Sequence, residues 1–346
     1  MICMSETIDS SCSDVGGAGP SKPSRWLVWL FGAAACVALV FVVTHLSEEK
    51  EFLRLIEKSE PYWLFLALVL QAGTYLTQGI GWRVVVHFHG HRLGMLRASE
   101  LSLAMLFVNQ TLPSGGISGE AMISNAFVRA GMSQSVVWSV TLVNFAMYYL
   151  AYALCMMVAL VFALYHGYFG FWVNVTILIF ALVALGVAWF VAVLHVRKMI
   201  WLKSKLRLHR KIAGLLDSMI RSHIGSVRDM RVYRKVFACH VMTFMLDAAT
   251  FWVVVRALGV VAPIEGIFVS LMISTMFRTI AIMPGGLGTF EAAAVMSLKS
   301  IGLPLMVGLS ATMLFRGLTF WLPMLPGFIA SRHFLGKKSD ALATAG

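Results

Sequence analysis

Charged residues are scarce in this chain of 346 residues. Asp, Glu, Lys and Arg together make up 13% of the sequence, whereas hydrophobic residues make up 59%. A soluble domain carries about 25% charged residues. The deficit is explained if lipid, rather than water, faces most of the surface. Because the apolar residues form long runs, the composition predicts an all-α polytopic membrane protein.

The chain also lacks the sequence patterns of a metal or nucleotide site. Its five cysteines show no metal-ligand spacing, and three of them (Cys36, Cys155 and Cys239) lie inside apolar runs. They are therefore interpreted as core- or lipid-facing thiols, without a disulfide framework. No Gly-x4-Gly-Lys-Ser/Thr phosphate-binding loop occurs, which argues against ATP-driven chemistry by this chain alone. We expect neither a metal nor a cofactor.

Positive charge is unevenly distributed. The net charge is +12, and twelve of the 28 Lys and Arg residues lie in residues 197–235, together with the acids Asp217 and Asp229. Basic loops beside apolar spans stay on the cytoplasmic side and attract anionic lipid head groups. Residues 196–235 are therefore predicted to form a basic amphipathic segment on the inner leaflet, and nucleic acid is not an expected partner.

Six apolar runs are long enough to cross a bilayer. They comprise residues 26–46, 62–86, 136–164, 171–194, 236–258 and 304–330. We assign residues 25–335 to one transmembrane domain, between a disordered cytoplasmic tail (1–24) and a short cytoplasmic tail (336–346). Lys22 and Arg25 precede the first run, so both termini of this multi-pass protein are expected on the cytoplasmic side of the cell membrane.

Two Pro-Gly stretches interrupt apolar sequence, and they match each other at five positions. The matched residues are Pro113, Gly115, Ser118, Glu120 and Ala121 in the first stretch, and Pro284, Gly286, Thr289, Glu291 and Ala292 in the second. Pro and Gly break a helix. Ser118 or Thr289 is then expected to cap a new helix whose first turn carries the glutamate.

Each stretch therefore predicts a helix, a break and a second helix. The apolar segments 101–112 and 264–283 precede the breaks, and a glycine (Gly131 or Gly302) follows each glutamate by eleven residues. Counting spans between the breaks places them on opposite faces of the membrane. We therefore expect two re-entrant hairpins related as an inverted repeat, packed inside the protein or lining a wet cavity.

Ionisable residues inside predicted membrane segments are costly, and are functional candidates for that reason. They are Glu120, Asp247, Arg278, Glu291 and Arg316. We expect the two arginines to bind a lipid phosphate, and the glutamates to balance them in the empty site or to accept a cationic head group. Asn144 would add polar lining. The alternative is that these charges form structural ion pairs that hold the hairpins in place.

The sequence resembles a known family. The segment from Pro284 to Ala292, preceded by Arg278 and followed by Arg316, is similar to the signature of the lysylphosphatidylglycerol synthase transmembrane-domain family, also called flippase-like domain proteins. The Trp82-Arg83 pair, here interpreted as interfacial, and the stretch from Pro113 to Glu120 resemble that family's first-half motif. The resemblance covers roughly residues 25–335.

The resemblance implies translocation of a polar-headed lipid between leaflets, for example an aminoacyl-phospholipid, a hopanoid or a polyprenyl-linked glycolipid. The partners would be membrane lipids with anionic or zwitterionic head groups. Members that synthesise the lipid carry a soluble aminoacyl-transfer domain, which we do not expect here, so an enzyme is not the first interpretation. Two alternatives stay open: a membrane-embedded lipid-modifying transferase that uses Glu120 or Glu291 as a base, and a scaffold for lipid-synthesis enzymes.

Overall fold

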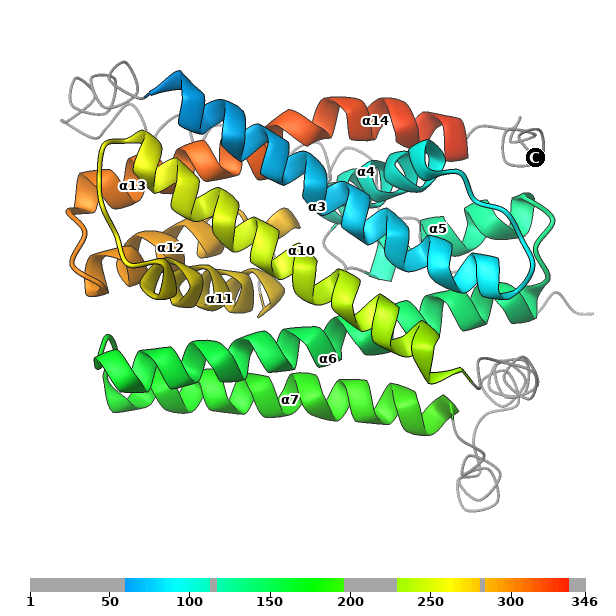
Figure 1. Ribbon diagram of the computed structural model, residues 1–346, viewed down its shortest axis with the longest axis horizontal. Helices are drawn as coiled ribbons and strands as arrows, with labels where there is room; N and C mark the ends of the chain where they lie inside the picture. Colours follow the sequence, from blue (N-terminus) through cyan, green and yellow to red (C-terminus); the bar gives the residue numbers. More distant parts are fainter. Residues whose placement is uncertain (1–59, 113–116, 196–228, 281–283, 336–346) are drawn as a thin grey trace, which may run out of the picture.

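The computed structural model describes residues 60–112, 117–195, 229–280 and 284–335, and all regular structure among them is helical (Figure 1). The helices are α3 (Pro61–Phe88), α4 (Met95–Thr111), α5 (Ile117–Arg129), α6 (Gln134–His166), α7 (Phe171–His195), α10 (Met230–Ala257), α11 (Ile264–Ile280), α12 (Thr289–Ser300), α13 (Leu305–Arg316) and α14 (Leu322–Leu335), with a 3-10 turn at Pro284–Gly286 and a π-helical turn at Gly317–Trp321.

Among the described residues, five helical segments are long and apolar enough to cross a membrane. They are Pro61–Phe88, Gln134–His166, Phe171–Trp189, Met230–Ala257 and Leu305–Phe334. Each overlaps a predicted span, so the prediction of an all-helical multi-pass membrane protein is confirmed. Large apolar side chains such as Leu182 of α7 and Leu325 of α14 point outward and are more than half exposed. Such a surface suits lipid contact.

Several predictions lie outside the described residues. These are the tail 1–24, the span 26–46, most of the basic segment 196–235, the tail 336–346, and the break residues Pro113 and Gly115.

Two pairs of shorter helices lie between the long ones. In Figure 1, α4 and α5 occupy one end of the bundle, and α11 and α12 occupy the opposite end. α4 ends and α5 begins near the middle, and the break between α11 and α12 also lies there. α4 and α11 have 17 residues each, or about 25 Å at 1.5 Å per residue, which is less than the roughly 30 Å hydrocarbon core.

The two halves of the chain share one spacing. The interval from Pro113 to Pro284 also separates the first residues of α6 and α13, Gln134 and Leu305. It separates Gly131 (φ 82°) from Gly302 (φ 96°), which end α5 and α12 in the left-handed region that glycine tolerates. The N–H of each of these glycines donates to the carbonyl three residues earlier. The N–H of the residue after each glycine donates to the carbonyl five residues earlier. Thus α5 and α6 correspond to α12 and α13, and they follow α3 and α4 as α12 and α13 follow α10 and α11.

The last span is not a uniform α-helix. The single predicted helix over residues 304–330 is divided into α13 and α14 by the π-helical turn, which starts directly after Arg316. A π-turn adds one residue to the turn and redirects the side chains around it. Here it places Thr319 and Phe320 on the wall of the central cavity described below. Periodicity along this largely apolar run gave no sign of the turn.

Trp82 corrects another sequence interpretation. Its side chain is 1% exposed and packs in a cluster with Leu101 of α4 and Phe127 of α5. It is therefore a core residue between helices, and not an interfacial anchor. Trp82 of the family-like Trp-Arg pair accordingly packs α3 against the first helix pair.

α14 approaches α4 closely at a glycine, which gives the first prediction. A Cβ at Gly327 would lie 2.6 Å from the Leu103 carbonyl oxygen and 2.9 Å from the Phe107 Cβ. We expect Gly327→Ala to push α14 away from α4 and to reduce stability by about 1–3 kcal/mol. Thermal unfolding of the purified protein measures the loss.

Gly186→Ala on α7 is the matched control, because a Cβ there meets nothing within 4 Å. It should leave the melting temperature unchanged or raise it slightly. Equal melting temperatures for the two variants would show that the α4–α14 contact does not limit stability.

Candidate functional site

A polar cavity of about 290 Å³ lies in the middle of the bundle. Its walls come from α3, α4, α5, α6, α10, α11, α12, α13, the π-helical turn and the second break. It is lined by charged residues from several helices, namely Glu120, Asp247, Arg278 and Arg316. Charged groups rarely occur at this depth in an apolar bundle unless they face one another or water. The cavity is therefore the candidate functional site.

The second break brings two chain segments against this cavity. Gly285 and Gly286 have φ values of 61° and 68°, in the left-handed region. A Cβ on Gly285 would lie 2.3 Å from the Phe320 ring, and one on Gly286 would lie 2.5 Å from Cγ of Arg278. Only glycine satisfies both the backbone angle and this close approach. The Pro-Gly-Gly stretch thus determines the positions of the Arg278 and Phe320 side chains.

Arg316 is held by the same break. Its Nε donates to Glu291 Oε1 at 2.6 Å, and its Nη2 donates to the Gly285 carbonyl at 3.2 Å. The guanidinium carbon lies 4.2 Å from the ring centroid of Phe320 and 5.0 Å from that of Phe290, which suits cation–π contact. Arg316 is 3% exposed and Glu291 is 7% exposed. This is a buried, charge-assisted pair that joins α13 to α12.

The cap of α12 differs from the prediction. Glu291 lies in the first turn, as expected, but the N-cap residue is Gly288, and its N–H donates to Glu291 Oε2 at 2.7 Å. Thr289 is already helical, and its hydroxyl donates to the Gly286 carbonyl. The glutamate reaches the free N–H three residues back, so no hydroxyl cap is needed. In the first break, α5 starts at Ile117, so Ser118 lies inside the helix rather than before it.

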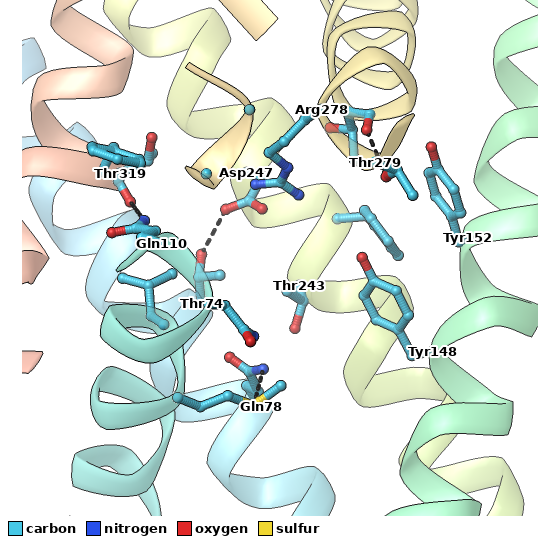
Figure 2. A pocket seen from close by; sticks show the side chains of 18 of the residues that line it. Thr74, Gln78, Gln110, Tyr148, Tyr152, Thr243, Asp247, Arg278, Thr279 and Thr319 are labelled. Atoms are coloured by element: carbon cyan, nitrogen blue, oxygen red, sulfur yellow. Dashed lines mark hydrogen bonds between the residues drawn. The ribbon is translucent and has the colours of Figure 1, made fainter. Parts of the chain in front are cut away.

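Arg278 and Asp247 form a second charged group in the cavity. Figure 2 shows the Arg278 side chain, at the end of α11, directed toward the carboxylate of Asp247 on α10. The two charges interact, and Asp247 also accepts a hydrogen bond from the Thr74 hydroxyl at 3.3 Å. Arg278 is exposed at the cavity wall, in contrast to the buried Arg316. Arg278 is thus the guanidinium that an incoming anion can reach.

Glu120 and Asn144 line the cavity from the first half of the chain. Glu120 lies in the first turn of α5, as predicted, and its Oε2 is buried without a hydrogen-bond partner among the residues that the structure describes. Asn144 donates to the Val140 carbonyl, while its Oδ1 is likewise unpartnered. Two buried acceptors therefore face the same space.

The structure thus brings five of the six predicted head-group residues to one cavity. The sixth, Glu291, lies behind Arg316 and does not line it. Sequence analysis missed the polar side chains of α3, which have helical spacing within an apolar span: Gln71, Thr74, Tyr75 and Gln78. That i, i+3, i+4, i+7 stripe is a signal that could have found them. It also missed Tyr148 and Tyr152 of α6, which Figure 2 shows on the opposite wall.

A bundle of apolar helices around a charged cavity defines a multi-pass membrane protein with an internal polar site. Comparison with known proteins gives its family. Residues 26–327 match the family described as lysylphosphatidylglycerol synthase TM region, and the chain belongs to this family. A protein of Methanothermobacter thermautotrophicus named UPF0104 membrane protein is 21% identical over 335 residues, which cover 90% of this chain and 96% of that protein. Membership implies a lipid-related membrane function.

The buried pair gives the second prediction. Arg316→Gln or Glu291→Gln strands one buried charge, so each variant should lose about 3–5 kcal/mol of stability. The double variant should lose clearly less than the sum of the two losses, because neither charge is then left alone. Thermal or denaturant unfolding of the four proteins measures this coupling.

Lys299→Gln is the control, since Lys299 is exposed at the end of α12 and should contribute little to stability. Additive losses in the double variant would mean that the 2.6 Å contact between Arg316 and Glu291 is not energetically important.

Proposed function

We propose that this protein moves a polar-headed lipid between the leaflets of the cytoplasmic membrane. The observation that supports this most directly is the charged cavity in the middle of the bundle, at the point where both helix breaks lie. A volume of about 290 Å³ suits a head group rather than a whole lipid. The acyl chains would therefore stay in the bilayer while the head group passes through the cavity.

In this proposal, α4 with α5 and α11 with α12 are re-entrant hairpins related as an inverted repeat. Their shared spacing and their placement at opposite ends of the bundle support the relationship. Irregular backbone is tolerated at membrane depth only where it is packed in protein or lines a wet cavity. Leu112, directly before the first break, and Gly285 and Gly286 of the second break line this cavity. Transporters built from such repeats place the substrate between the two breaks.

The lipid phosphate is assigned first to Arg278. Its guanidinium is exposed at the cavity wall and can form paired hydrogen bonds to phosphate oxygens. Arg316 adds positive charge from the opposite side of the break, but two of its nitrogens are already bonded to Glu291 and Gly285. The substrate class is a lipid with an anionic or zwitterionic head group.

A transferase in which Glu291 acts as a base is disfavoured by its contacts. Both carboxylate oxygens of Glu291 accept hydrogen bonds, one from Arg316 and one from the Gly288 N–H. A base must have an acceptor site directed at the proton that it removes. Mass spectrometry of the lipids after the assay below tests for chemical modification directly.

Reconstitution tests the proposed function and gives the third prediction. The purified chain in liposomes should speed the exchange of a fluorescent anionic phospholipid between leaflets, measured by quenching of the outer leaflet. Arg278→Gln removes charge-assisted hydrogen bonds worth about 1.5–3 kcal/mol. The exchange rate should therefore fall roughly 10- to 100-fold.

Lys299→Gln, on the exposed end of α12, is the control for loss of one positive charge and should retain the wild-type rate. If exchange with the wild-type protein is no faster than in empty liposomes, lipid translocation is the wrong function. If Arg278→Gln exchanges at the wild-type rate, the phosphate assignment is wrong.

Orientation gives the fourth prediction. In a cysteine-free background, Gly170→Cys lies before α7, and Gly94→Cys lies before α4; a Cβ at either glycine meets nothing within 4 Å. With cytoplasmic termini, a membrane-impermeant thiol reagent should label position 170 in intact cells, and position 94 only after lysis. The opposite pattern would reverse the orientation.

A further inference from the structure

The two glutamates of the breaks occupy equivalent positions but have different surroundings. Glu291 is bonded through both oxygens, and its charge is balanced by Arg316. The interval that relates Glu120 to Glu291 pairs Arg316 with Phe145, which is apolar. The first half therefore has the acid without the arginine, and Glu120 Oε2 is buried without a partner among the described residues.

In the part of the chain that the structure describes, no cation forms an ion pair with Glu120. On α4, Asn109 is already engaged, since its Oδ1 accepts from the Gly119 N–H at 2.8 Å. On α6, Tyr149 interacts electrostatically with Glu120, and as a phenol it is neutral. On α14, Arg332 and His333 are exposed. Among the groups that line the same cavity, Arg278, Arg316 and His240 are those that can carry a positive charge.

A charge count shows what the unpaired acid does to the cavity. Glu120, Asp247 and Glu291 are the acids in or beside it, Arg278 and Arg316 are the arginines, and the imidazole of His240 also lines it. With the carboxylates and the arginines ionised and the imidazole of His240 neutral, the site carries one excess negative charge, which repels a lipid phosphate. With a proton on Glu120, the site is formally neutral. A buried carboxylate without a counter-charge is also costly as an anion.

We propose that Glu120 is a proton-binding site that couples lipid movement to proton movement. One proton from the aqueous phase bonds to the Glu120 carboxylate as an anionic head group enters the cavity, and it leaves to water on the other side with that head group. Anion and proton then cross together without net transfer of charge. This inference rests on the proposed function, because it takes the cavity as the place where the phosphate binds.

The fifth prediction uses the full chain in liposomes that contain a fluorescent anionic phospholipid. A transmembrane pH gradient should drive the labelled lipid into the leaflet that faces the alkaline side. Glu120→Gln mimics the protonated state, so exchange should continue but the accumulation should vanish. Glu100→Gln, an exposed acid on α4, is the matched control and should behave as wild type.

Equilibrium binding of the same lipid in detergent provides a readout that does not depend on transport. Wild-type affinity should rise toward acid pH, by up to about tenfold per pH unit while one proton is taken up. Glu120→Gln should bind tightly at every pH. Thermal unfolding of both proteins checks that the variant is folded.

These measurements distinguish failure of lipid translocation from failure of the proton site at Glu120. Absence of exchange in the wild type, with binding still linked to pH through Glu120, refutes translocation and keeps the proton site. Exchange that ignores the pH gradient, or a pH response that survives Glu120→Gln, refutes the proton site alone. A sodium gradient that drives accumulation in place of the pH gradient also refutes it, and so does loss of folding together with binding in the variant.

Discussion

The ion pair between Arg316 and Glu291 is the interaction on which the second half of the site depends. It is buried and short, and it joins the last span to the first turn of α12. Because the same carboxylate also accepts the Gly288 N–H, it fixes the break as well as the arginine. Gly285 and Gly286, in the same break, then allow Phe320 and Arg278 to approach the backbone to contact distance. Removing either charge would disturb all of these positions together.

The two halves use this arrangement differently. The second half neutralises its glutamate internally and presents Arg278 to the cavity, whereas the first half leaves Glu120 without a cation among the described residues. A repeated fold with unequal charges gives a site with an anion-binding part and an acidic part. That asymmetry suits a lipid phosphate accompanied by a proton. It arises from two differences: Phe145 stands in place of Arg316, and the last turn of α4 has no basic residue in place of Arg278 of α11.

Much of the fold could be predicted, because lipid imposes strong constraints. The apolar runs located all five described spans within a few residues, and the Pro-Gly stretches located both breaks. First-turn positions for Glu120 and Glu291 followed from their distance to those breaks. The errors were local: Gly288 caps α12 instead of Thr289, Trp82 is buried, and a π-helical turn divides the last span. Each of these features depends on a local contact: which group accepts a hydrogen bond from one backbone N–H, or which side chain fills one gap between helices.

The sequence by itself determined that lipid surrounds most of the protein and that the fold is helical. It also determined the two matched breaks and the set of ionisable candidates. All of these follow from composition and from local backbone chemistry. Only the tertiary structure decided which charges meet. Arg316 finds Glu291 rather than Asp247, Arg278 is left open to the cavity, and Glu120 keeps a buried oxygen without a partner. Pairing in a low-dielectric interior depends on distances of a few ångströms between helices, and these distances are set by packing at residues such as Gly285, Gly286 and Gly327.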